Sequence, residues 1–255
     1  ADKRTHADAT KPGNMLVVFG RSDREDLSHL PESRHRGAGT VFSKIAGADR
    51  DDIEIFVHCP FSYMLDNEEE LRNDKSLIVQ ITLNDNAAEA GLLIGGDAGC
   101  KTWRIVHNRS KKAGNNDRLE WDVFFVPHHG SYKFFTEKEH EEGREEAAKN
   151  PAESSMSILA AGRDLGWLVC SSRPVKEGNY EDKYPPHIEA VGHYRKCAEN
   201  LGDKERFVCL MQHPSEDNPS PLVLRLTAGG LQKTVLAAAS ISVGAKATSD
   251  PSRWG

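Results

Sequence analysis

Two short polar clusters carry the residue types best suited to chemistry, and each follows an apolar run. Residues 95–99 have the sequence GGDAG, and residues 127–131 have the sequence PHHGS. Glycines let the backbone turn closely, so an aspartate at the end of a buried strand can direct its oxygens at one or two divalent cations. Imidazole nitrogens and carboxylate oxygens both bind Zn²⁺ at about 2.0–2.2 Å. Asp97, His128 and His129 are therefore the candidate metal ligands and catalytic residues.

The two histidines are expected to differ in role. Neighbouring residues on a strand point to opposite faces, so one imidazole would bind a cation and the other would bond a carboxylate or the substrate. Ser131 and Lys133 follow closely enough to contact a substrate anion. His187, which follows Pro186, either lines the same site or caps a helix. Either cluster alone is more often a plain turn, but the two in this order favour a shared site.

Hydrophobic patterning predicts strands separated by helices, and hence an α/β fold in one domain spanning residues 1–255. A basic stretch, residues 101–118, is expected to be a solvated loop or a contact for a nucleic-acid backbone. The charged residues 136–149 are expected to form a solvated helix, and residues 187–200 a second helix. The expected strands are residues 15–20, 52–58, 76–83, 91–96, 121–127 and 166–171, with a C-terminal hairpin of residues 221–227 and 231–237.

Composition narrows the class of protein. No apolar run in the 255 residues approaches the roughly 20 that a membrane helix needs, and no signal peptide opens the chain, so we expect a cytoplasmic protein without a membrane partner. The formal charge of −6 argues against broad, charge-driven nucleic-acid binding but leaves room for a local site. Five cysteines without a CxxC pair are expected to be free, buried thiols.

Several segments resemble one known family. Residues 73–79 (NDKSLIV), 92–98 (LLIGGDA) and 122–131 (DVFFVPHHGS) are similar to the series NNxSLVL, LLTGDA and DVLKVPHHGS of metallo-β-lactamase-fold hydrolases, in the branch of the competence (ComEC) DNA-uptake proteins. Residues 166–172 and 184–189 resemble that branch's ISVGxxNxYGHPxxEV element. The resemblance runs from about residue 53 to residue 195, and its HHGS part is the most specific.

This resemblance implies an αββα sandwich with a site for one or two metal ions, zinc or alternatively manganese. Asp97 would be the shared ligand, with His128 and His129 beside it. The implied activity is hydrolysis by a metal-activated water, most simply of a phosphodiester bond in a nucleic acid or a related substrate.

Three departures from the family pattern affect this expectation. The HxHxDH signature that normally precedes these motifs is missing, since no two histidines of the chain are two positions apart. The family's YGHP is replaced by YPPH at residues 184–187, and its SVG by residues 170–173 (CSSR).

The missing signature has two explanations. Either an N-terminal segment or a partner chain supplies the first strands, so that this chain forms the C-terminal, larger part of the sandwich, or the chain is a degenerate member. In the second case the function would be that of a non-catalytic regulatory or binding component that keeps the fold without the metal. The first case is favoured because residues 1–55 contain only one convincing apolar strand.

Overall fold

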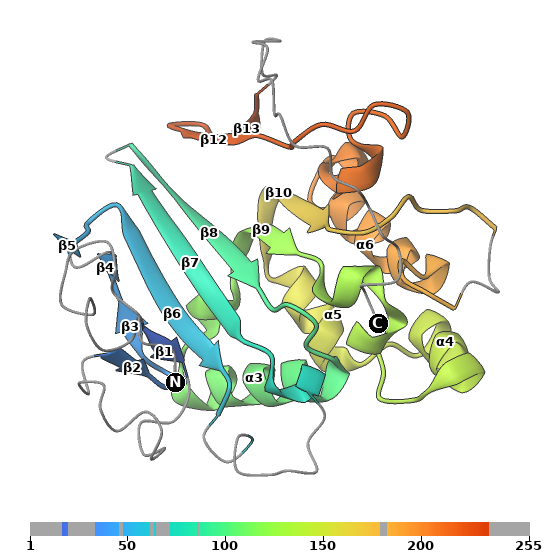
Figure 1. Ribbon diagram of the computed structural model, residues 1–255, viewed down its shortest axis with the longest axis horizontal. Helices are drawn as coiled ribbons and strands as arrows, with labels where there is room; N and C mark the ends of the chain where they lie inside the picture. The colour runs from blue at the N-terminus through green and yellow to red at the C-terminus, as the bar shows by residue number, and fades with distance from the viewer. Residues whose placement is uncertain are drawn as a thin grey trace, which may run out of the picture.

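A seven-stranded mixed sheet forms the centre of the computed structural model, which describes residues 17–19, 34–45, 48–61, 64, 72–85, 87–178 and 183–234 (Figure 1). Its strand order is β11-β10-β9-β8-β7-β6-β3. The strands are β3 (Val41–Phe42), β6 (Ile53–Cys59), β7 (Ile78–Asp85), β8 (Ala88–Ile94), β9 (Trp121–Phe125), β10 (Gly162–Cys170) and β11 (Phe207–Cys209).

Strand direction changes across this sheet. Neighbouring strands are antiparallel from β3 through β6 and β7 to β8. They are parallel from β8 through β9 and β10 to β11. Parallel strands end at the same edge of a sheet, and loops at that edge are the usual place for ligands in open α/β sheets. The segments that follow β8, β9 and β10 therefore meet at one edge.

Helices and short pairs of strands complete the described structure. The helices are α3 (Cys100–Ala113), α4 (His140–Lys149), α5 (Glu153–Ala160) and α6 (Ile188–Asn200). The 3-10 turns are η3 (Arg72–Lys75), η4 (Asn116–Leu119), η5 (Pro127–Gly130), η6 (Tyr132–Phe134), η7 (Lys204–Arg206) and η8 (Leu210–Gln212). The paired short strands are β1 (Val18–Phe19) with β2 (His35–Arg36), β4 (Lys44–Ile45) with β5 (Ala48–Asp49), and β12 (Leu224–Thr227) with β13 (Gly230–Lys233).

The main core lies between the sheet and helices α3, α5 and α6. It contains Trp103 of α3, Trp121 and Phe124 of β9, and Tyr194 of α6, all fully buried. The indole of Trp121 donates a hydrogen bond to the Ile158 carbonyl of α5 at 2.8 Å. Burial of large aromatic side chains contributes strongly to stability, so this face holds the sheet and the helices together.

The opposite face of the sheet is covered differently. Beside β9, β10 and β11, a small cluster around Val123, Trp167 and Val169 packs against the β12–β13 hairpin, which lies over the sheet (Figure 1). Beside β6 and β7, another cluster contains Val57 and Val79. The α/β class is thus confirmed, while the second large sheet of an αββα sandwich is not among the described elements and stays a prediction.

Most of the expected elements are present. Residues 52–58, 76–83, 91–96, 121–127 and 166–171 correspond to β6, β7, β8, β9 and β10, and the expected pairing of β7 with β8 is confirmed. Residues 187–200 correspond to α6, and the C-terminal hairpin is present as β12 and β13. The expected helix of residues 136–149 begins only at His140. Residues 15, 16, 20 and 235–237 of the expected strands lie outside the described residues.

The basic stretch of residues 101–118 is not a loop, and that expectation was wrong. It forms most of α3 and then η4. Trp103, Val106 and Ser110 recur at helical spacing and are buried, while the lysines lie on the outer side. Gly114 ends the helix in a left-handed conformation at φ 75°, as helix-terminating glycines commonly do. α5 was also missed, because its eight residues contain little periodic signal.

All five cysteines are buried and free, as expected. In the described part of the chain, no helix is both long and apolar enough to cross a membrane.

Gly95, the first residue after β8, is in close contact with α3. A Cβ atom there would lie 2.1 Å from Cζ2 of the buried Trp103. We expect Gly95→Ala to lower the free energy of unfolding by about 1–3 kcal/mol, because the indole cannot move without disturbing the core. Urea unfolding measures this change. Gly192→Ala is the matched control: Gly192 has open space around its Cα within α6, so alanine should raise stability by about 0.5–1 kcal/mol. If Gly95→Ala and Gly192→Ala changed the free energy of unfolding equally, the close contact of Gly95 with Trp103 would be contradicted.

His58 of β6 joins the sheet to α3 and is almost fully buried. Its Nε2 lies 2.8 Å from the Arg118 carbonyl and its Nδ1 lies 3.4 Å from the Ser110 hydroxyl. Nε2–H therefore donates to the carbonyl, and Nδ1 accepts from the hydroxyl. Burial lowers the pKa of His58 to about 4, partly opposed by the hydrogen bond to Arg118.

This lowered pKa predicts a loss of stability in mild acid. The unfolded chain protonates His58 below about pH 6.5, and the folded chain does so only below about pH 4. The free energy of unfolding therefore falls by about 3 kcal/mol as the pH is lowered from 6.5 to 4. We expect His58→Gln to lose less stability over that range, as followed by urea unfolding from pH 7.5 to 4. The exposed residue His140, changed to Gln, should leave the wild-type pH dependence unchanged.

Candidate active site

The two polar clusters meet at the edge where the parallel strands end. Asp97 lies in the turn between β8 and α3, and the histidine pair lies in η5 directly after β9. The backbone N–H of His128 donates to the Gly96 carbonyl at 2.9 Å, which ties the two turns together. Two segments about thirty positions apart in the chain thus form one local structure.

The histidines do not lie on an extended strand, so the expectation that they point to opposite faces of one was wrong. His128 and His129 have φ values of 49° and 55°, and Gly130 follows with 81°. Left-handed conformations are uncommon for residues other than glycine and cost free energy. Backbone strain of this kind is often found at functional sites. In this turn the His128 ring lies against Asn73, and the His129 ring lies between Asp97 and Ser171.

Asp97 and His129 face each other across a short gap. Oδ1 of Asp97 lies 3.4 Å from Nε2 of His129, and both side chains are about half exposed. Nδ1 of His129 lies 2.7 Å from the Ser171 carbonyl, just after β10. A carbonyl can only accept, so Nδ1 of His129 carries a proton and Nε2 is the nitrogen that faces the carboxylate and could bind a cation.

This arrangement places two electron-pair donors next to each other. Without a proton or a cation between them, a carboxylate oxygen and an imidazole lone pair repel. Two ligands bound at about 2.0–2.1 Å in tetrahedral geometry are about 3.3 Å apart, which is close to the observed 3.4 Å. The pair therefore fits two ligands of one divalent cation, and the hydrogen bond to Ser171 is the kind of support that metal-binding histidines usually have.

His128 is the more enclosed of the two histidines. Its Nε2 lies 3.2 Å from Nδ2 of Asn73, the second residue of η3, and its Nδ1 is buried without a hydrogen-bond partner in the described part of the chain. Burial lowers the pKa of His128, an effect that nearby Asp97 partly opposes. The ring is accordingly neutral at pH 7 and positioned by Asn73. A buried polar atom without a partner is unusual enough to indicate an incomplete site.

A cavity of about 240 Å³ opens beside Asp97 and His128. The charged residues lining it are four carboxylates and two lysines, namely Asp74, Asp97, Glu137, Glu139, Lys101 and Lys133. Lys133 pairs with Glu139, and the Lys101 ammonium lies 4.0 Å from Asp74. Glu137 pairs with Arg104, so Asp97 is the lining carboxylate without a cationic partner among the ion pairs of the described residues.

The three residues expected to bind substrate lie at different depths. Lys133 lines the cavity. Ser131 is buried, and its hydroxyl accepts a hydrogen bond from the Lys133 backbone, so it caps η6. His187 is buried against Tyr132 and occupies the position before the first turn of α6, and its backbone N–H donates to the Gly130 carbonyl. Ser131 and His187 thus support the histidine turn from behind.

The described residues supply part of a metal site. They contain no group of three His, Cys, Asp or Glu side chains placed to hold one ion. Asp97 and His129 are the two that face each other, with His128 next to them. Sequence reasoning gave no role to Asn73, although it is part of a family-like motif. It suggested that residues 170–173 (CSSR) bring a hydroxyl and a guanidinium near the site or are merely structural, whereas Ser171 contacts His129 through its backbone carbonyl.

No protein-family model, curated protein or solved structure matches this chain.

The hydrogen bonds predict opposite tautomers for two histidines of the same protein. In metal-free protein at pH 8, His129 should carry its proton on Nδ1 and His58 on Nε2. Long-range ¹H–¹⁵N spectra of protein labelled at histidine distinguish the two forms, and the variants His129→Gln and His58→Gln assign the signals. A proton on Nε2 of His129 would show that its electron pair does not face Asp97.

Proposed function

We propose that this protein is a metal-dependent hydrolase that acts on phosphodiester bonds, with Asp97 and His129 as ligands of the same divalent cation. The observation that carries the proposal is the 3.4 Å approach of the Asp97 carboxylate to Nε2 of His129, whose Nδ1 is hydrogen-bonded to the Ser171 carbonyl. The hydrogen bond from Nδ1 of His129 to the Ser171 carbonyl positions the imidazole, and metal-binding histidines usually have such support.

A divalent cation at this position would lower the pKa of a coordinated water to about 7 and so supply hydroxide at neutral pH. Asp97 and His129 would hold the ion, which we take to be zinc or manganese, present as one or two ions. His128 is neutral at pH 7 and lies beside Asp97, so it can act as a further ligand or as a hydrogen-bonding partner of the substrate.

The choice of a phosphodiester substrate rests on the resemblance of residues 122–131 to the DNA-uptake branch. The charges that line the cavity also affect how such an anionic substrate would bind. Lys101, Lys133 and Arg104 are paired with Asp74, Glu139 and Glu137, so an anionic substrate would meet the unpaired Asp97 carboxylate unless a cation is bound there. Substrate binding should therefore depend on the metal. The cationic side chains that line the cavity, and that we propose bind a phosphate oxygen, are Lys101 and Lys133.

A second candidate is a non-catalytic regulatory or binding component that keeps the fold without a metal. The observation that favours it is the lack of a three-residue ligand group among the described residues. The hydrolase needs further ligands, which we propose come from a more N-terminal segment or from a partner chain that also completes the sandwich. A cytoplasmic location remains part of the proposal.

Metal binding by the full chain separates these functions. Isothermal titration with Zn²⁺ and Mn²⁺ should show stoichiometric binding to the wild type, and Asp97→Asn or His129→Gln should weaken it by at least about tenfold. Once the segment or partner chain that supplies the further ligands is present, hydrolysis of bis(p-nitrophenyl) phosphate should fall to background in both variants, with the urea midpoint nearly unchanged. The exposed Asp164, changed to Asn, is the matched control and should retain binding and activity.

Two outcomes would reject parts of the proposal. A folded wild-type protein that binds neither metal when the segment or partner chain proposed to complete the site is present supports the non-catalytic component. Full turnover in Asp97→Asn removes this carboxylate from the site.

A further inference from the structure

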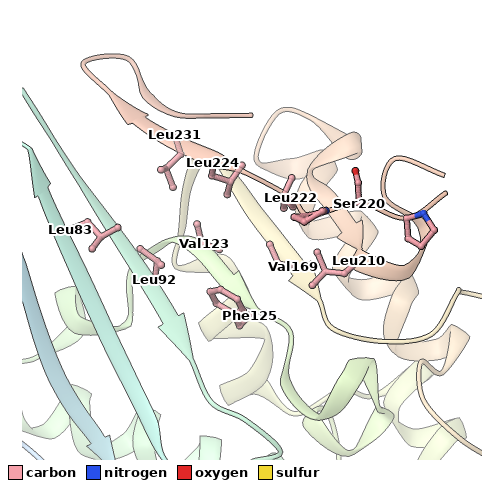
Figure 2. Close-up of a pocket in the computed structure, with 12 residues that line it drawn as sticks. Leu83, Leu92, Val123, Phe125, Val169, Leu210, Ser220, Leu222, Leu224 and Leu231 are labelled. Atoms are coloured by element: carbon pink, nitrogen blue, oxygen red, sulfur yellow. The ribbon is translucent and has the colours of Figure 1, made fainter. Parts of the chain in front are cut away.

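Two cavities adjoin the β12–β13 hairpin. One has a volume of about 560 Å³, lies between the hairpin and the sheet, and is lined by apolar side chains such as Val123, Leu224 and Leu231 (Figure 2). It belongs to the sheet face that the proposed segment or partner chain would cover. The other has a volume of about 780 Å³ and lies at β11, the strand at one end of the sheet, where α6, η7 and β13 also line it. The two cavities share no lining residue, and we call the second one the β11 cavity.

His213 is a buried polar side chain that lines the β11 cavity. It is 8% exposed, and its ring nitrogens have no hydrogen-bond partner in the described part of the chain. Its backbone is held on both sides, because its N–H donates to the Leu210 carbonyl and its carbonyl accepts from the Ser220 N–H. Burial lowers the pKa of His213, and the charge of Lys233 lowers it further, so the ring is neutral at pH 7. Most buried polar side chains have a partner, so this imidazole indicates that a ligand or water completes the cavity.

The charged side chains of the β11 cavity are mostly cationic. They are Arg195, Lys196, Lys204 and Lys233, with the carboxylates Glu199 and Glu205. Arg195 pairs with Glu177, and Lys196 pairs with Glu199. Lys204 and Lys233 take part in no ion pair of the described residues, although the charge of Lys204 also contributes to the lowered pKa of Glu199. An anion placed at Lys233 and His213 is therefore attracted without having to break an existing ion pair.

The edge strand β11 offers backbone groups to the same cavity. It pairs with β10 alone and ends the sheet, so the N–H and C=O groups on its outer side have no partner strand. All three of its residues line the cavity. A peptide added as a further strand would gain few backbone hydrogen bonds from three residues, since strands usually have about 5–6. The edge therefore suits a small molecule with hydrogen-bond acceptors better than it suits a peptide.

We propose that the β11 cavity is a binding site for a small organic phosphate, whose phosphate group lies between Lys233 and His213. The oxygens of a phosphate accept hydrogen bonds from ammonium, imidazole and backbone N–H groups, and groups of each kind line this cavity. The two lysines without an ion pair match the double charge of a phosphate monoester better than the single charge of a carboxylate.

The remaining walls suit the organic part of such a ligand. Phe207, Val208 and Pro214 supply apolar surface. The volume lies within the range of about 300–1,000 Å³ typical of ligand pockets. No residue of this cavity lines the one beside Asp97, so the proposal holds or fails independently of the proposed hydrolase.

The test is isothermal titration of the full chain with phenyl phosphate at pH 7.5, after a chelating resin has removed metal ions that would bind phosphate elsewhere. Phenyl phosphate should bind, benzoate should bind more weakly, and phenol should not bind measurably. The affinity for phenyl phosphate should fall at least about threefold between 50 and 300 mM NaCl, because salt screens partly exposed charges. The proposal is overturned if phenyl phosphate does not bind, or if phenol or benzoate binds as tightly.

Matched variants separate this cavity from the general charge of the surface. Lys233→Gln and His213→Phe should each weaken phenyl phosphate binding about tenfold, the loss expected for a hydrogen bond to a charged group. Lys111→Gln removes the same charge from an exposed position of α3 that does not line the cavity, and it should leave the affinity unchanged. Lys233 is exposed, so its variant keeps the fold even where the urea midpoint of His213→Phe is lowered. An unchanged affinity in Lys233→Gln, or equal losses in Lys233→Gln and Lys111→Gln, overturns the proposal.

Discussion

The candidate site depends on the fixed approach of the Asp97 carboxylate to the imidazole of His129. The hydrogen bond from Nδ1 of His129 to the Ser171 carbonyl sets the tautomer, and the hydrogen bond from the His128 backbone to Gly96 sets the spacing of the two turns. Both supports use backbone groups at the ends of β8, β9 and β10. The parallel arrangement of these strands is therefore a precondition for the site, because antiparallel neighbours would place alternate ends at opposite edges.

The left-handed turn at His128 and His129 needs its own support, since it costs conformational free energy. Buried groups behind the turn supply that support. Tyr132 and His187 pack ring against ring, and the His187 backbone N–H bonds to the Gly130 carbonyl. A Cβ atom on Gly130 would lie 3.1 Å from Cβ of Pro186, so the turn also fits tightly against the segment before α6. Residues far apart in the sequence thus combine to hold two imidazoles at the sheet edge.

The two faces of the sheet differ in what they can bind. The helix face beside β9 is filled by aromatic side chains such as Trp103, Trp121 and Phe124. The opposite face carries an apolar cavity under the β12–β13 hairpin, while the strand ends carry carboxylates around Asp97. The two places differ in charge, because carboxylates surround the strand ends and apolar side chains line the cavity under the hairpin.

The sequence by itself determined the element types with strong periodicity and the residues with metal-binding chemistry. β6, β7, β8, β9, β10 and α6 follow from local hydrophobic patterns, and Asp97 and the histidine pair follow from residue type and position after apolar runs. The α3 helix was missed because its charged outer face masked a buried stripe around Trp103 and Val106. Only the tertiary structure decided the left-handed turn, the roles of Asn73 and the Ser171 carbonyl, and the burial of Ser131 and His187. These depend on contacts between segments distant in the chain, and a backbone carbonyl or a burial depth has no signature in the residue letters.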